Sequence, residues 1–568
     1  MLVGACLVLG GSQVVAALTD MNVYAACFLI PLVVAVYVIV GGLRSTFLCD
    51  YTHTVILFLA IFIFGFLMYC TSPIIGSPSA FYDLLVSASQ QMPIARNTEG
   101  SYLTFRSVDG LIFAVDLLVA GFSTVWLDQA YWQRAIASRP ETSVRAYLLG
   151  GIAWYGIPYG FATAMGLGCA ALTSSPSFPT YPQALTSAQN NAGLSSPATA
   201  IALLGKGGAV LMLLLLFMAV TSSTSAELIA VSSLLTFDVY KTYIHPASSS
   251  QRLVQVSHAG IVIYALVLAT FCCILNAAGV NLTWLLTVLG VIVGAAGLPV
   301  GLVLLWPRMS TAATIASPWI GLAMGLIAWF VTTVKRSGSI TVDTTGDVTN
   351  AVAGNLASCG GGAVVAFVLT FIFPKQHIST QARDIERANK IKGVRAPTVE
   401  STSPDPQHSP EGEVGDAEKA AEISTAKEGP INKHEKPPKS SPEAEAVVPT
   451  GNELVDYLEA KQMEPMDPEL VKKGEKLAVA FNWIYLLIAL ILVPFTLFGT
   501  GYVYNKAFFT GWVVVSFIWV WVSMLICVIY PVVESAGALK HISRGLWMDA
   551  MSLFGKSKPR AREAYGTA

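Results

Sequence analysis

The sequence predicts an all-α, polytopic membrane protein. Of its 568 residues, 54% are hydrophobic and only 12% are charged, whereas soluble domains carry about a quarter charged residues. Apolar runs of roughly 17 to 25 residues, long enough to cross a bilayer as helices, recur along most of the chain. This composition excludes a large soluble enzyme, and the net charge of −1 gives no sign of a nucleic-acid partner.

Taken in order, the apolar runs predict spans at 22–43, 51–71, 108–134, 146–173, 207–240, 253–275, 282–306, 311–334, 355–374, 477–500 and 508–533. Residues 1–18 are also apolar and resemble the tail of a span. They offer neither the basic region nor the cleavage site of a secretory signal. We therefore expect an unusual start or a missing upstream part.

The segment 375–476 has a different composition. It is rich in Pro, Glu, Lys and Ser and poor in aromatic residues, so it cannot bury enough apolar surface to fold alone. We expect a disordered cytoplasmic tether, with a regulatory module as the alternative. The chain then divides into a transporter-sized core (1–374), this segment, two C-terminal transmembrane helices (477–535) and a basic cytoplasmic tail (536–568).

Basic residues occur in alternate loops, at Arg44, Arg134, Arg139, Arg145, Lys241, Arg252 and Arg308, while 174–205 contains neither Lys nor Arg. Because cytoplasmic loops carry the excess of Lys and Arg, we expect the basic loops, the segment 375–476 and the C-terminus to be cytoplasmic. The plasma membrane is the expected location.

The span 207–240 contains the run MAVTSSTSAELIAVSSLLTFDVY, which is crowded with hydroxyl groups. Ala219, Ser222 and Ser223 are spaced i, i+3 and i+4, so they share one helix face. Two hydroxyls and a main-chain carbonyl suit a hard cation such as Na⁺. The alternative is that the hydroxyls bond to their own helix and permit close packing. Glu227 lies one turn beyond Ser223, and an ionisable side chain at this depth favours a functional role.

The span 108–134 and its extension form a second polar cluster. The stretch 121–124 (GFST) interrupts the apolar run near its middle, where we expect the helix to unwind. Beyond it come aromatic, amide and carboxyl groups that suit a small polar solute such as urea: Trp126, Asp128, Gln129, Tyr131 and Trp132. For Arg134 an interfacial anchor is the favoured interpretation, and an ion pair with Asp128 is the alternative.

Three stretches carry a family resemblance: GGLRSTFLCDYTHTVILF (41–58), DQAYWQRAIASRP (128–140) and MAVTSSTSAELIAVSSLLTFDVYKTYI (218–244). They resemble the sodium:solute symporter superfamily and, within it, the urea active transporter branch of fungi and plants. The similarity runs from residue 1 to about 374 and resumes in the last two spans.

The resemblance implies the leucine-transporter fold of two inverted five-helix repeats, here with the first repeat incomplete and with extra C-terminal helices. It makes 108–140 the broken sixth core helix and 207–240 the eighth. The superfamily's sodium site lies between the eighth helix and the first broken helix, and the matching eighth-helix positions are Ala219, Ser222 and Ser223. Residue 1 corresponds to the end of the third helix, so the chain is expected to be N-terminally truncated, with half of this site upstream.

Two departures bear on the substrate. The sixth helix has Ala-Gly-Phe-Ser-Thr at 120–124 in place of the usual GNFGT-like break, and Leu286 and Ala295 stand where a Tyr and a Ser are usual. Pockets that bind N–H and C=O groups discriminate through such contacts. A related nitrogenous solute such as a polyamine is therefore the alternative to urea.

The sequence thus predicts a secondary active symporter that imports urea or a related solute by alternating access, coupled to Na⁺ or H⁺. Its expected partners are the solute, the coupling cation and the lipid bilayer, without an organic cofactor. The alternatives are a transport-inactive nutrient sensor and a truncated, non-functional product. We do not expect an enzyme, since the sequence shows no nucleophile–base pair, phosphate loop or metal cluster.

Overall fold

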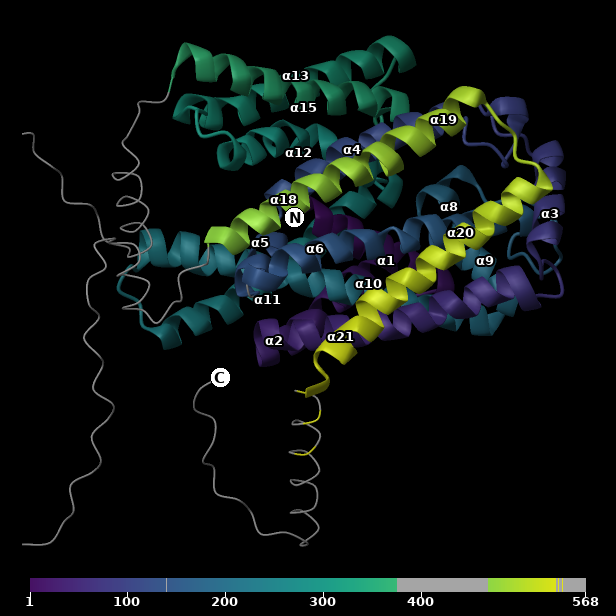
Figure 1. Cartoon of the computed structure of the whole chain (residues 1–568), viewed down its shortest axis with the longest axis horizontal. Helices are drawn as coiled ribbons and strands as arrows, with labels where there is room; N and C mark the ends of the chain where they lie inside the picture. Colours follow the sequence, from purple (N-terminus) through teal and green to yellow (C-terminus); the bar gives the residue numbers. More distant parts are fainter. Residues whose placement is uncertain (139, 375–467, 538–539, 541–543, 545–568) are drawn as a thin grey trace, which may run out of the picture. The chain divides into compact units, whose positions relative to one another are not determined.

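The computed structural model describes residues 1–374 except 139, residues 468–537, and residues 540 and 544. Most of the predicted segment 375–476 and the end of the basic tail lie outside these described residues. The described part is almost entirely helical (Figure 1) and belongs to one compact unit formed by Met1–Lys375 and Glu469–Ala568.

The helices that build this unit follow the predicted order along the chain. Their bounds are α1 (Leu2–Thr19), α2 (Val23–Phe66), α3 (Pro78–Gln91), α4 (Val108–Leu127), α5 (Gln129–Ala137), α6 (Pro140–Trp154), α7 (Thr163–Leu172), α8 (Ser187–Asn191), α9 (Ser195–Leu204), α10 (Lys206–Ser233), α11 (Ser250–Ala277), α12 (Leu282–Leu305), α13 (Thr311–Ser337), α14 (Val342–Thr345), α15 (Val348–Ile372), α18 (Pro468–Tyr485), α19 (Val493–Thr500), α20 (Lys506–Met524) and α21 (Tyr530–Glu534). Short π-helical segments extend several of them, including Ile157–Ala162 before α7 and Leu234–Ile244 after α10.

Within the described residues, eleven helical segments are long and apolar enough to cross a membrane. This confirms the predicted class of a polytopic helical membrane protein. Two details differ from the prediction. Leu2–Thr19 is itself long enough to span, and the predicted span 146–173 is divided into α6, a π-helical segment and α7. Pro158 lies at the start of that segment, where its missing N–H interrupts the regular helical ladder.

The helix α2 and the π-helical segment Leu67–Thr71 that follows it form two spans, Val23–Leu43 and Ser45–Thr71, with a bend at Gly42. Gly42 has φ 55° and ψ −149°, a conformation that only glycine adopts without strain. The second span therefore starts earlier than its predicted first residue, 51. This places Asp50 inside a helix rather than in a loop.

Small residues bring α4, α12, α13 and α15 close together. Gly297 of α12 touches α4 so closely that a Cβ there would lie 2.5 Å from the Ser123 Oγ, and a Cβ at Gly325 of α13 would lie 2.5 Å from the Ser358 Cβ of α15. Such residues let helix backbones approach within a membrane. Figure 1 shows α12, α13 and α15 as neighbours, with α4 beside α12.

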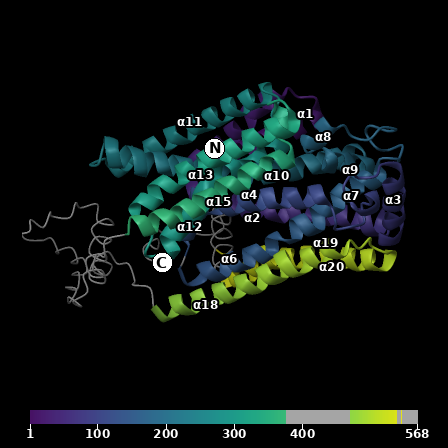
Figure 2. The ribbon, with the colours of Figure 1, turned by 90° about the horizontal axis from the view of Figure 1, so that it is seen from above.

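The C-terminal helix α20 completes a core that begins more than 400 residues earlier in the sequence. Phe509 of α20 is buried with Phe64, Met68 and Phe81, and the Tyr82 hydroxyl donates to the Tyr504 carbonyl oxygen at 3.1 Å. Figure 2 shows α18, α19 and α20 along one edge of the bundle, beside α6. The span Val471–Thr500 contributes no buried residue, so α20 is the C-terminal helix that packs into the core.

Candidate functional site

Some hydroxyls of the helix α10 bond to their own helix and others bond to neighbouring helices: the Ser232 hydroxyl donates to the Ser257 carbonyl oxygen of α11 at 2.7 Å. The Thr221 and Ser225 hydroxyls donate to the carbonyl oxygens of Phe217 and Ser222, each at 2.7 Å. The Ser222 hydroxyl instead donates to Oδ1 of Asp50 at 2.5 Å. The predicted alternative to a cation site, hydroxyls that bond within their own helix, therefore holds for Thr221 and Ser225. Ser222 instead links α10 to α2.

Asp50 joins three elements of the fold. Its Oδ1 accepts from Ser222 of α10, and its Oδ2 accepts from Nη2 of Arg134 of α5 at 2.7 Å. The side chains of Arg134 and Asp50 are 32% and 19% exposed. The predicted alternative of an Asp128–Arg134 ion pair is therefore wrong, because Arg134 pairs with Asp50.

Sequence reasoning missed Asp50 although it lies within the 41–58 stretch that carries the family resemblance. The predicted span began one residue after it, so an acid at the start of a helix was taken for part of a loop. The proximity of α2 and α10 was the second missing fact, since 172 residues separate Asp50 from Ser222.

The other two predicted cation ligands lie beside Ser222 on α10. Ala219 is half-buried and Ser223 is exposed. The next hydroxyl along the helix, Thr224, is fully buried and its oxygen has no hydrogen-bond partner. A cation site at Ala219, Ser222 and Ser223 stays a prediction. The structure adds the carboxylate of Asp50 as a neighbouring group whose oxygens could coordinate a cation.

The expected unwinding at 121–124 is wrong. The helix α4 continues from Val108 to Leu127, and the Thr124 hydroxyl bonds to the Ala120 carbonyl oxygen at 2.7 Å within it. The interruption occurs at Asp128, which has φ −84° and ψ 112° and separates α4 from α5. Its side chain accepts from the Ala130 N–H at 2.9 Å. Asp competes for backbone N–H groups at helix starts, whereas Gly and Thr are tolerated inside membrane helices.

The break exposes backbone groups that aromatic residues then cover. The Trp126 carbonyl is one of the last four of α4, which lack an intrahelical donor, and it accepts from the Trp132 indole N–H at 3.1 Å. The two Trp ring centroids are 6.1 Å apart. The Tyr131 carbonyl accepts from the Tyr147 hydroxyl at 2.7 Å. Tyr131 itself is exposed, and Gln129 is half-buried on α5.

Glu227 brings α10 to the same break. It is 7% exposed, and its carboxyl group lies near enough to that of Asp128 for the two charges to influence each other. The structure thus places four predicted site residues from α4, α5 and α10 together: Trp126, Asp128, Trp132 and Glu227. Two neighbouring carboxylates, one buried and one half-buried, repel each other when both are ionised. This pair therefore favours a proton, a cation or a hydrogen-bond donor between its members.

Residues 3–321 match the model of the "Sodium:solute symporter family". The chain is 36% identical to a "Urea active transporter" of Saccharomyces cerevisiae, over 96% of this chain and 74% of that protein. It is 41% identical to the "Urea-proton symporter DUR3" of Oryza sativa subsp. japonica, over 66% of this chain and 53% of that one.

A solved structure of a Na⁺-coupled sialic acid symporter in a substrate-bound outward-open state matches with 16% identity and a TM-score of 0.47, covering 66% of this chain and 75% of that one. The family model and the yeast relative each extend over more than half of the chain, so the predicted family is confirmed. The chain belongs to the sodium:solute symporter family, whose members are transporters and not enzymes.

Proposed function

We propose that this protein imports urea by cation-coupled symport. The observation that carries the proposal is its 36% identity, over 96% of the chain, to a protein named as a urea active transporter. The chemistry at the break between α4 and α5 is compatible with this substrate. Urea offers four N–H donors on a flat molecule, and the break offers two carboxyl groups and two Trp rings.

The substrate would bind among Trp126, Asp128, Trp132 and Glu227, with Gln129 and Tyr131 at its border. Asp128 and Glu227 would accept N–H bonds from urea, which relieves their mutual repulsion. The rings would cover its faces, as aromatic walls do in small-molecule sites. A polyamine is the second candidate substrate, because its ammonium groups would also satisfy the carboxyl pair.

The coupling cation would bind at Ala219, Ser222 and Ser223, next to Asp50. Because Ser222 already donates to Asp50 at 2.5 Å, a Na⁺ ion that takes the serine oxygen would bring the carboxylate into its coordination sphere or displace it. This cluster adjoins α5 through Arg134. Cation binding would therefore shift α5, the helix that follows Asp128, and would couple the cation site to the substrate site during alternating access.

The positive-inside pattern supports an orientation with the basic loops in the cytoplasm, and a plasma-membrane location is part of the same proposal. Arg134 follows this pattern only in part, since its guanidinium is held by Asp50.

Uptake in yeast cells that lack their own urea transport tests the proposal. Cells that express the full chain are expected to accumulate labelled urea above the external concentration and to lose the gradient when an ionophore dissipates the cation gradient. A chain that reaches the membrane without accumulating urea would contradict the symporter and favour a transport-inactive sensor. Competition by unlabelled polyamines distinguishes the two candidate substrates.

The double variant Ser222→Ala/Ser223→Ala tests the cation site. It is expected to weaken the apparent affinity for the coupling cation at least tenfold, since two oxygen ligands are lost. Thr221→Val is the matched control, because the Thr221 hydroxyl bonds only within its own helix. Unchanged ion dependence in the double variant would refute the site.

A further inference from the structure

A further acidic residue lies inside the membrane-spanning part of the protein, away from both proposed sites. Asp116 is the ninth residue of α4 and is 0% exposed. At 1.5 Å per residue it lies about 12 Å from the start of its helix. Because the hydrocarbon core is roughly 30 Å thick, this depth is well inside it.

Asp116 touches two neighbouring helices through a single amide. Nδ2 of Asn355, on α15, donates to Oδ1 of Asp116 at 2.6 Å and to the Thr287 carbonyl oxygen of α12 at 2.9 Å. Asn355 is also 0% exposed. Oδ2 of Asp116 and Oδ1 of Asn355 have no hydrogen-bond partner. The bundle therefore contains a carboxyl group that receives one hydrogen bond and presents one bare oxygen.

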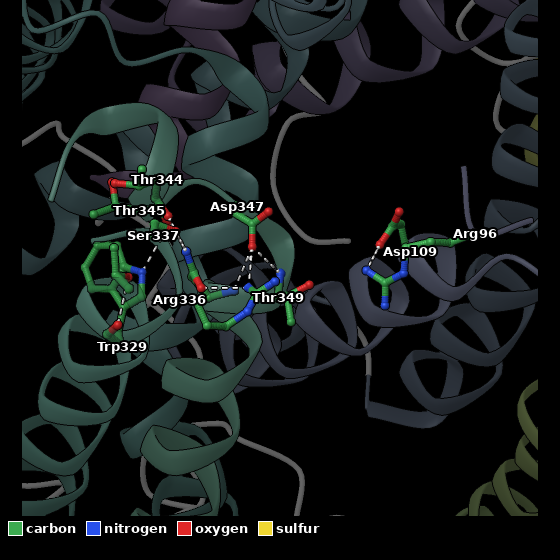
Figure 3. A network of polar contacts seen from close by, with 11 residues as sticks. Arg96, Asp109, Trp329, Arg336, Ser337, Thr344, Thr345, Asp347 and Thr349 are labelled. Carbon is green, nitrogen blue, oxygen red and sulfur yellow. Dashed lines mark hydrogen bonds and ion pairs between the residues drawn. The ribbon is translucent and has the colours of Figure 1, made fainter. Parts of the chain in front are cut away.

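No cation is available to this carboxyl group from the helices packed against α4. The helix α12 has no charged or titratable side chain, and α15 has only the thiol of Cys359, with Asp347 capping its start. The charged groups at the starts of α4 and α15 are engaged in ion pairs (Figure 3): Arg336 is 2.9 Å from Asp347, and Asp109 of α4 is 2.5 Å from Arg96.

An ionised carboxylate is strongly destabilised in this buried environment. Unpaired buried charges cost several kcal/mol or more, and proteins avoid that cost by pairing the charge or by neutralising it. A metal ion would need several oxygen ligands, and the bare oxygens here are only two. The space is also tight, since a Cβ at Gly290 would lie 2.7 Å from Oδ1 of Asn355. A proton on Asp116 Oδ2 neutralises the carboxylate without requiring additional space.

We propose that Asp116 is a proton-binding site and that it carries a proton coupled to transport. Its Oδ2 takes a proton from a hydronium ion, which leaves as water, and later returns the proton to water. In the packed arrangement seen here Asp116 is neutral. Release requires α4 to separate from Asn355 and α12, so that water can solvate the carboxylate.

The helix that carries Asp116 also ends at Asp128, twelve residues further on, at the proposed urea site. At 1.5 Å per residue the two are about 18 Å apart along one axis. A movement of α4 therefore changes both the environment of the proton and the position of the break. This inference rests on the proposed urea symport and specifies a coupling site for it that differs from Ser222 and Ser223.

The test is concentrative urea uptake by the full chain between pH 5 and pH 8. Asp116→Asn fixes a neutral side chain of the same shape, so it is expected to retain downhill urea equilibration, to lose accumulation, and to vary less than twofold with pH. Wild-type uptake is expected to rise at least tenfold as the pH falls. Asp109→Asn is the matched control, because that acid lies in the exposed first turn of the same helix, and it should keep the wild-type pH profile.

A second variant keeps the proposal testable if Asp116→Asn is not produced. Asn355→Ala removes the N–H donor that favours the ionised carboxylate, so the midpoint of the pH profile should move to higher pH. An unchanged midpoint, or a wild-type pH profile in Asp116→Asn, would overturn the proton site while leaving urea import intact. Absence of urea accumulation in the wild type at every pH would overturn the proposed function, and the proton site with it.

Discussion

The ion pair between Arg134 and Asp50 should contribute measurably to stability, and a double-mutant cycle can isolate its coupling energy. The cycle consists of Arg134→Gln, Asp50→Asn and the double variant. The charged atoms are 2.7 Å apart and the side chains are 32% and 19% exposed. Unit charges about 4 Å apart attract by about 4 kcal/mol at an effective dielectric constant of about 20.

Desolvation and solvent screening reduce this gross attraction. Exposed pairs contribute about 0 to 1 kcal/mol, whereas breaking a fully buried pair costs about 3 to 5 kcal/mol. The pair at Asp50 is intermediate in burial, so we expect a coupling energy of about 1 to 2 kcal/mol. Its sign should be stabilising, because each single variant leaves one charge facing a neutral group.

The assay is equilibrium unfolding of the purified protein in mixed detergent micelles, with SDS as the denaturant. The matched control cycle uses Lys506 and Asp83, which are 2.8 Å apart but 46% and 61% exposed. That control should give a coupling energy below about 1 kcal/mol. If the energies of the two Asp50-site variants add to within about 0.3 kcal/mol, the partial burial does not strengthen the pair and the reasoning fails.

Two further changes test the packing around α4 and its break. Gly297→Ala should lower the free energy of unfolding by about 1 to 3 kcal/mol through overpacking, since its Cβ would lie 2.5 Å from the Ser123 Oγ. A Cβ at Gly121 would have nothing within 4 Å, so Gly121→Ala should instead raise the free energy of unfolding by about 0.5 to 1 kcal/mol. Equal effects of the two in the same unfolding assay would contradict the close α4–α12 contact. Trp132→Phe keeps an aromatic ring but leaves the Trp126 carbonyl without its hydrogen-bond donor, so the free energy of unfolding should fall by about 1 to 3 kcal/mol. A decrease below about 0.5 kcal/mol would mean that water replaces the indole N–H.

The membrane-spanning architecture could be predicted because hydropathy is a local property of the chain. Each apolar run must form its own helix in lipid, whatever its neighbours are. Helix ends were harder to place. The predicted span start at 51 excluded Asp50, and the break was assigned to 121–124 because its glycine and hydroxyl residues interrupt the apolar run near its middle. Within a membrane the cap at Asp128 decided the outcome.

Candidate site residues could be grouped from the sequence only where they lie in one helix or one short run. Ala219, Ser222 and Ser223 follow from helical spacing, and Asp128 and Trp132 from a short polar run. The contacts that join helices did not follow, since Asp50–Ser222 and Asp116–Asn355 span 172 and 239 residues. Asp116 was missed, although an acid within an apolar run is a signal of function that the sequence alone offers.

The contact between Tyr82 and Tyr504 also sets a timescale for biosynthesis. The two residues are 422 positions apart, and ribosomes add about 5 to 20 residues per second. About 20 to 80 s therefore pass between the synthesis of the aromatic face of α2 and α3 and the synthesis of α20. During that interval lipid or the insertion machinery must cover Phe64 and Phe81, and any early termination would leave this face open.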